Sequence, residues 1–294
     1  MAVILVVSSA AAVAALLAGA VAWALPNFDP AAPHAARRAV VAAAAKETEA
    51  HPKLASYVRS RLDPAQLTGL ALTVALVLLV AGAIAVGALL AMVQHNAGLA
   101  RWDLSAARWG GDHATGTSTR FLRDVSLLGG TYCMIVVALV AAVEESRRTR
   151  TAAVVGFLTV VVVGQLIVMN LTKFVVDRAR PDIDRLTGFS GSSFPSGHAT
   201  TAAATFAAIA LLIGRGRSQR VKALLAGAAA AIAVAVAASR VLLGVHWFTD
   251  VVAGLAMGWG WFALSSIAFG GRVLRFGRPA EVAEEVSALV DATP

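Results

Sequence analysis

Long runs of apolar residues, separated by short polar segments, form the dominant pattern along the chain. A helix needs roughly 20 such residues to cross the hydrocarbon core of a bilayer. Uncharged runs near that length occur at 2–25, 67–94, 125–143, 151–172, 197–214, 223–238 and 251–271. The sequence therefore predicts an all-α protein, a polytopic bundle of seven transmembrane helices.

The polar segments divide the chain into three predicted domains. Residues 1–66 combine an N-terminal hydrophobic helix with an amphipathic cytoplasmic segment, which Pro52 interrupts. Residues 67–271 form a six-helix membrane domain, and 272–294 form a cytoplasmic tail. Within the membrane domain, the stretch "RWDLSAARW" carries tryptophans that suit a helix lying in the headgroup layer.

The first apolar run allows more than one interpretation. Its stretch Ala22-Trp23-Ala24 resembles a signal-peptidase site, but no basic residue precedes the run. Cleavage would leave 26–66 outside and invert every later helix, which the basic loops described below oppose. We therefore expect an uncleaved helix, either with an external N-terminus or lying at the membrane interface.

Composition narrows the class of protein further. The 294 residues are 58% hydrophobic and 14% charged, with a mean hydropathy of +0.74, which excludes a soluble domain with an ordinary surface. The formal charge of +8 is dispersed between apolar runs, so we expect no nucleic-acid partner. Cys133 is the only cysteine, so neither a disulfide framework nor a thiolate metal site is available.

Basic residues in the tight loops predict the orientation of the helices. Lys and Arg collect in "EESRRTRT" (144–151) and "RGRSQRVK" (215–222), and cytoplasmic loops hold the excess of these residues. If both loops are cytoplasmic, the polar residues that flank the last four runs lie on the extracytoplasmic side. These are Lys173, Arg180, Ser196, Gly197, His198, Arg240, His246 and Asp250.

The first two polar clusters have features of an anion site. Lys173 and Arg180 in "KFVVDRARP" are seven residues apart, so two helical turns would place both cations on one helix face. Lys173 taken alone is more typical of an interfacial lysine. In "PSGH", Ser196 can cap a helix and Gly197 allows close approach to a ligand. The unpaired N–H groups of such a helix start suit phosphate.

The third cluster, "SRVLLGVHWFTD", pairs a histidine with a carboxylate. His246 and Asp250 are four residues apart, so Asp250 can bond one ring nitrogen and leave the other as a nucleophile. The alternative is a structural ion pair at a helix start. With the cations and His198 as an acid, these residues suit phosphoryl transfer without a metal. No cluster has the spacing of a zinc site, so we expect no metal and no cofactor.

The three clusters together resemble the signature of the type 2 phosphatidic acid phosphatase superfamily. The matching segments are "KFVVDRARP" (173–181), "PSGH" (195–198) and "SRVLLGVHWFTD" (239–250). The resemblance covers about 67–271 and implies a six-helix phosphatase core, with 1–66 outside it.

The family resemblance also implies a mechanism. His246 attacks phosphorus to form a phosphohistidine, Asp250 orients His246, and His198 protonates the leaving group. The implied phosphate ligands are Lys173, Arg180, Ser196, Gly197 and Arg240. The expected partners are the membrane and a lipid phosphate, best matched by undecaprenyl pyrophosphate, with phosphatidic acid or phosphatidylglycerol phosphate as alternatives; the sequence leaves the oligomeric state open.

The sequence is also compared with three other functions that use similar residues: a haloperoxidase, a soluble acid phosphatase, and a transporter or scaffold. The related vanadium haloperoxidases and acid phosphatases that resemble this chain are soluble, whereas this chain is not. A non-enzymatic anion or lipid transporter or scaffold would also carry polar membrane residues, but the runs at 197–214 and 223–238 are almost wholly apolar away from their ends. The sequence thus favours an enzyme.

Overall fold

The computed structural model describes residues 1–24, 80, 82, 84–149, 152–183 and 185–273. The predicted amphipathic segment 26–66, most of the run 67–94 and nearly all of the tail 272–294 lie outside the described residues. Every regular element of the described part is helical, which confirms the predicted fold class.

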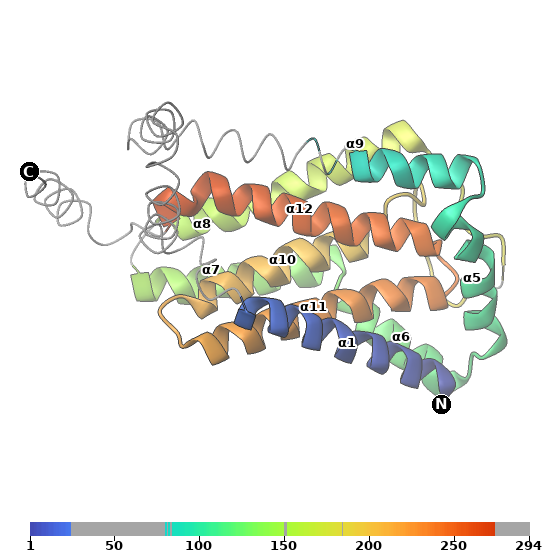
Figure 1. Ribbon diagram of the computed structural model, residues 1–294, viewed down its shortest axis with the longest axis horizontal. Helices are drawn as coiled ribbons and strands as arrows, with labels where there is room; N and C mark the ends of the chain where they lie inside the picture. Colours follow the sequence, from blue (N-terminus) through green and yellow to red (C-terminus); the bar gives the residue numbers. More distant parts are fainter. Residues whose placement is uncertain (25–79, 81, 83, 150–151, 184, 274–294) are drawn as a thin grey trace, which may run out of the picture.

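Most of the helices lie side by side in one elongated bundle, and α5 lies across one end of it (Figure 1). The first is α1 (Ala2–Ala24), and a shorter apolar helix occupies Ile84–Gln94. The others are η1 (Gly98–Trp102), α5 (Asp103–Asp112), α6 (Gly116–Leu127), α7 (Thr131–Thr149), α8 (Ala152–Thr159), the π-helical turn η2 (Val160–Gly164), α9 (Gln165–Val176), α10 (Gly197–Gly214), α11 (Gln219–Leu242) and α12 (Phe248–Val273).

Five helical spans in the described part are long and apolar enough to cross a membrane. They are Ala2–Trp23, Val154–Val176, Gly197–Gly214, Gln219–Leu242 and Phe248–Phe269. The bent pair α6 and α7 makes a sixth if it counts as one span. The predicted span at 67–94 is represented only by Ile84–Gln94, because the residues before it are almost all undescribed.

The prediction of one continuous helix over 125–143 is wrong in one respect, because the structure has a break within this run. α6 ends at Leu127 and α7 begins at Thr131, with a bend of 48° between them. A Cβ atom on Gly129 would lie 2.8 Å from the carbonyl oxygen of His198 and 2.5 Å from Val236. The break therefore brings bare backbone against the start of α10, where no larger residue fits.

Small residues let α10 and α12 approach closely. A Cβ atom on Gly254 would lie 2.7 Å from the carbonyl oxygen of Ser196, and one on Gly258 would lie 2.7 Å from Ala203. Since these glycines are one helical turn apart, they form a flat strip against the small residues of α10. The strip fixes the start of α10 relative to the start of α12, which sets the spacing of the polar residues there.

The N-terminal helix α1 packs along α11 (Figure 1). Gly227 of α11 lies so close to α1 that an added Cβ would be 2.7 Å from the carbonyl oxygen of Ala15. At the other end of α1, Val3 and Val7 are buried in one cluster with Leu243 and Val245. α1 therefore supports the loop between α11 and α12, the loop that carries His246.

Candidate active site

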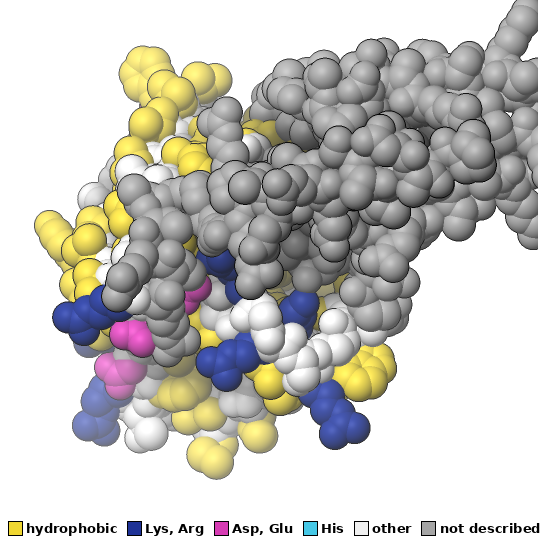
Figure 2. All heavy atoms as spheres, turned by 90° about the vertical axis from the view of Figure 1, so that its left-hand side faces the viewer, with side chains coloured by type: hydrophobic (Ala, Val, Ile, Leu, Met, Phe, Trp, Pro, Cys, Tyr) yellow, Lys and Arg dark blue, Asp and Glu magenta, His cyan; other side chains and the backbone are white. Residues whose placement is uncertain are grey.

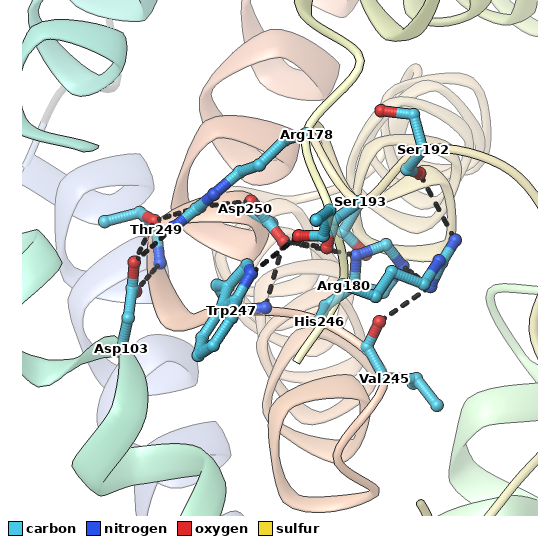
Figure 3. A network of polar contacts seen from close by, with 12 residues as sticks. Asp103, Arg178, Arg180, Ser192, Ser193, Val245, His246, Trp247, Thr249 and Asp250 are labelled. Atoms are coloured by element: carbon cyan, nitrogen blue, oxygen red, sulfur yellow. Dashed lines mark hydrogen bonds and ion pairs between the residues drawn. The ribbon is translucent and has the colours of Figure 1, made fainter. Parts of the chain in front are cut away.

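The predicted site residues lie together at one end of the bundle. Backbone and side-chain contacts link the end of α9 and its following loop to the starts of α10 and α12 and the end of α11 (Figure 3). His198 lies in the first turn of α10, two residues after Ser196, whose backbone N–H donates to the carbonyl oxygen of Asp250. Four chain segments that are separated in the sequence thus supply a single polar cluster.

A tight turn brings Arg240 and His246 together. Gly244 has a φ of +72°, a left-handed conformation that suits glycine after a helix end. The backbone N–H groups of Val245 and His246 both donate to the carbonyl oxygen of Arg240, at 3.2 and 3.3 Å. The end of α11 thereby closes on itself and holds His246 in a fixed place before α12.

The expectation that Lys173 and Arg180 share one helix face is wrong. α9 ends at Val176, and Asp177 adopts a left-handed conformation with φ +40°, so Arg180 lies in the following loop. The loop still brings both cations to the same place. The Lys173 ammonium donates to the carbonyl oxygen of Ser192 at 2.6 Å, and Arg180 Nη2 approaches that oxygen at 3.3 Å.

The guanidinium of Arg180 is fully engaged by the chain. Its Nε donates to the carbonyl oxygen of Gly191 and its Nη2 to that of Ser190, at 2.9 and 2.8 Å. Its Nη1 donates to the carbonyl oxygen of Val245 at 2.6 Å and lies 3.2 Å from His246 Nε2. The longest of these contacts are those to His246 and Ser192, so they are the ones most readily exchanged for a ligand.

The contact with Arg180 determines the tautomer of His246. A guanidinium can only donate, so His246 Nε2 must accept and carry the lone pair. The ring proton then lies on Nδ1, which faces Asp250 Oδ2 at 3.5 Å and makes no hydrogen bond with a described residue. Burial lowers the pKa of His246 to about 4, with the neighbouring carboxylate of Asp250 opposing the shift. His246 is therefore neutral near neutral pH, with Nε2 available as a nucleophile.

The carboxylate of Asp250 is fully buried and held by three groups besides His246. Arg178 Nη1 donates to Oδ1 at 2.6 Å. The hydroxyl of Ser193 and the backbone N–H of Trp247 both donate to Oδ2, the latter at 2.9 Å. Oδ2 also faces His246, so the bonds from Ser193 and Trp247 set the orientation of the Asp250 carboxylate towards the ring.

The "PSGH" segment starts α10 as predicted, but without a side-chain cap. Ser196 occupies the N-cap position and its Oγ makes no capping bond, while its backbone N–H donates to the carbonyl oxygen of Asp250 at 3.0 Å. A Cβ atom on Gly197 would lie 2.9 Å from the sulfur of Met169 and 4.0 Å from Lys173 Cε. Gly197 therefore lets the start of α10 lie beside the lysine.

His198 lies on the side of the cluster that the α6–α7 break forms. A Cβ atom on Gly130 would lie 4.0 Å from His198 Nε2. Nearby, Arg240 Nη1 donates to Ser126 Oγ, near the end of α6, at 2.7 Å. The α6–α7 break thus borders one histidine and one cation of the site.

Several buried polar atoms of the site have no hydrogen-bond partner among the described residues. They include Ser196 Oγ, Ser192 Oγ and Arg240 Nε. Buried donors are normally satisfied, and an oxyanion provides several acceptors at once. The donors of Ser196 and Arg240, with the unpaired N–H groups at the start of α10, are chemically suited to a phosphate group.

Sequence reasoning missed Arg178, Asp103, Ser193 and Ser126. Arg178 lies two residues before Arg180 and was not distinguished from it, and Asp103 is about seventy residues earlier in the chain. The only local signal is that Arg178 and Asp103 are charged residues in segments between apolar runs; nothing local distinguishes Ser193 and Ser126. Among the described residues, no group of three or more His, Cys, Asp or Glu side chains could hold a metal ion.

Comparison with known proteins finds one family model and several phosphatases similar to this chain. The family model described as the PAP2 superfamily matches residues 153–273. The lipid A 1-phosphatase of Rhizobium etli is 44% identical over 118 residues, which are 37% of this chain and 46% of that protein. The decaprenylphosphoryl-5-phosphoribose phosphatase of Mycobacterium tuberculosis is 34% identical over 135 residues, which are 44% of this chain and 68% of that protein.

A solved structure matches over a larger part of the chain. It is the transmembrane PAP2-type phosphatidylglycerolphosphate phosphatase from Bacillus subtilis, with a TM-score of 0.62 and 25% sequence identity. The match covers 67% of this chain and 98% of that one. By contrast, this chain spans less than half the length of the lipid A 1-phosphatases that it matches.

Proposed function

Because the chain belongs to the PAP2 superfamily, we propose that it is a membrane lipid phosphatase that works through a phosphohistidine. The observation that carries the proposal is the neutral, buried ring of His246, whose Nε2 carries the lone pair beside a cluster of cations. A nucleophile, a positive pocket and a second histidine are the groups that phosphoryl transfer requires.

In the first chemical step, His246 Nε2 attacks phosphorus and the bond to the lipid oxygen breaks. His198 donates a proton to that oxygen, and Asp250 stabilises the positive charge on the His246 ring. The phosphoryl oxygens are bound by Lys173, Arg180, Ser196, Gly197 and Arg240. Since every N–H group of Arg180 is engaged, its contact with Nε2 must be exchanged for a phosphate oxygen when Nε2 attacks.

In the second step, water attacks the phosphohistidine. His198, now neutral, takes a proton from the water, the phosphorus–nitrogen bond breaks, and inorganic phosphate leaves. The ring of His246 returns to its neutral tautomer with the proton on Nδ1. This cycle uses cations of the chain where other phosphatases use metal ions.

The substrate class that we propose is a lipid with a terminal phosphate or pyrophosphate. Undecaprenyl pyrophosphate is the first candidate, because an extracytoplasmic site suits a lipid carrier that must lose phosphate after export. Phosphatidic acid and phosphatidylglycerol phosphate are alternatives, and the names of the relatives add phosphorylated lipid A and a phosphoribosyl polyprenyl lipid.

Phosphate release from a panel of these lipids tests the proposal. We expect the purified protein to release phosphate equally with and without EDTA, and vanadate to inhibit it, because vanadate adopts the five-coordinate geometry of the transition state. Activity that disappears in EDTA and returns only with Mg²⁺ would contradict the cation-based mechanism. Binding or movement of lipid phosphate without any hydrolysis would favour a transporter or scaffold instead.

We further propose that the site faces the extracytoplasmic side. Figure 2 views the opposite end of the bundle, where Lys and Arg side chains are visible. Arg147 at the end of α7, and Arg217 and Arg220 beside the α10–α11 turn, are exposed there. Arg215 contacts Glu145 at 3.4 Å, so the end of α7 and the α10–α11 turn are adjacent. Such a basic end is typical of the cytoplasmic side.

Single cysteines test this orientation. Ser190, beside the site, and Ser218, at the opposite end, are both exposed. In a background where Cys133 is replaced, an impermeant maleimide applied to intact cells should label Ser190→Cys but not Ser218→Cys. Labelling of both after the membrane is opened is the control. The reverse pattern in intact cells would place the site in the cytoplasm and exclude the export-linked role.

A further inference from the structure

Arg178 bridges two carboxylates at the edge of the site (Figure 3). Its Nη1 lies 2.6 Å from Asp250 Oδ1, and its Nη2 lies 2.8 Å from Asp103 Oδ2. The side chains of Arg178, Asp103 and Asp250 are 15%, 7% and 0% exposed. A partly buried arginine that bonds two carboxylates at once has a well-defined position, because its planar group is held at both ends.

Asp103 also holds the first turn of α12. Its Oδ1 accepts the backbone N–H of Thr249 at 2.8 Å, and its Oδ2 accepts the Thr249 hydroxyl at 2.8 Å. Arg178 Nη1 donates to the same hydroxyl oxygen at 2.8 Å. Asp103 therefore satisfies an N–H group that the helix itself leaves unpaired, one residue before Asp250.

The charges explain why Asp250 needs a separate partner. His246 is neutral, so it does not balance the buried carboxylate. The other cations bond elsewhere: Lys173 and Arg180 donate to backbone carbonyl oxygens, and Arg240 donates to Ser126 Oγ. A phosphate bound beside His246 would attract these cations and repel the carboxylate of Asp250. Arg178 bonds Oδ1, the oxygen that does not face His246, and leaves Oδ2 directed at Nδ1.

We propose that Arg178 and Asp103 are positioning residues for catalysis: Asp103 anchors Arg178, and Arg178 holds Asp250 in the orientation that directs Oδ2 at His246. Neither residue touches the phosphate or the attacking nitrogen. This inference rests on the proposed phosphatase function. It links α5 to the nucleophile through two contacts, from Asp103 to Arg178 and from Arg178 to Asp250.

Two conservative substitutions, each with a matched control, test the inference. Asp103→Asn keeps the shape of the side chain but removes its charge, and Asp112→Asn makes the same change at an exposed position of α5. Arg178→Lys supplies one ammonium that cannot bond both carboxylates in the same way, and Arg108→Lys makes that change at an exposed position of α5. Thermal unfolding in detergent checks that each variant is folded.

We expect kcat to fall about 10-fold in Asp103→Asn and about 100-fold in Arg178→Lys, because a small misorientation of a reacting group costs up to that much. KM for the lipid and the inhibition constant of inorganic phosphate should stay within about twofold of wild type, since the phosphate ligands are intact. The two control variants should match wild type in all three constants.

The double variant Asp103→Asn/Arg178→Lys should be no slower than Arg178→Lys alone, because both changes act on one linkage. Variants with the kcat of their controls, a rise in KM at unchanged kcat, or fully additive losses in the double variant would each overturn the inference. If Asp103→Asn does not fold, Arg178→Lys decides by the same criteria. A wild-type protein that hydrolyses no phosphate ester would overturn the proposed function, and the inference with it.

Discussion

Replacing His246 with alanine is expected to reduce phosphate release roughly 10⁶-fold, to the background rate, as loss of a catalytic nucleophile does in other enzymes. The structure explains the size of the effect. Arg180 donates towards Nε2 and Asp250 faces Nδ1, so Nε2 of this ring is unprotonated and lies beside a cation. Among the other described side chains of the site, only His198 carries an imidazole nitrogen. His198 lies against the α6–α7 break.

The measurement that checks this is trapping of the intermediate. Brief incubation with a substrate labelled in its phosphate, followed by a denaturing quench, should give acid-labile label on the wild-type protein and none on His246→Ala. His95→Ala, which removes an exposed histidine, is the matched control and should label normally. Equal labelling of wild type and His246→Ala would remove His246 from the nucleophile role.

Replacing His198 with alanine is expected to lower kcat for lipid substrates about 10²- to 10⁴-fold, the usual contribution of a general acid. The loss should depend on the leaving group. An alkoxide needs a proton as it departs, whereas nitrophenolate does not, so p-nitrophenyl phosphate should be affected far less in the first step. Inorganic phosphate should still inhibit, because the phosphate ligands remain.

Burst kinetics separate the two roles of His198. With p-nitrophenyl phosphate, His198→Ala should release one equivalent of nitrophenolate quickly and then turn over slowly, since hydrolysis of the phosphohistidine still needs a base. Equal losses with lipid and aryl substrates, and no burst, would show that His198 does not act as the acid. Loss of phosphate inhibition would instead assign it to binding.

Much of the site could be predicted because its residues occupy the ends of helices on one side of the membrane. Helix parity and the basic loops were sufficient to group Lys173, "PSGH" and "SRVLLGVHWFTD", since successive spans alternate in direction. Local spacing was less informative. Lys173 and Arg180 were expected on one helix face, but the left-handed Asp177 ends α9 between them. The two cations still converge through the loop that follows.

The partners of the site residues could not be predicted from spacing. Arg178 and Asp103 are 75 residues apart in the chain, and their contact depends on α5 packing against the end of α11 and the start of α12. The break between α6 and α7 is similar, because an apolar stretch with two glycines is compatible with one continuous span. It is the close approach of Gly129 to His198 and Val236 that requires the break.

Residue types and their pattern along the chain were enough to identify a helical membrane protein, the polar residues that gather at one end of it, and a chemistry that suits phosphate. These properties follow from residue type and from periodicity along one chain. Contacts between distant segments establish which nitrogen of His246 carries the lone pair, which oxygen of Asp250 faces the ring, and which residues hold that carboxylate. Those features depend on distances of 2.6 to 3.5 Å between α5, the loop after α9, and the start of α12, and side-chain contacts between distant segments leave no periodic trace in a sequence.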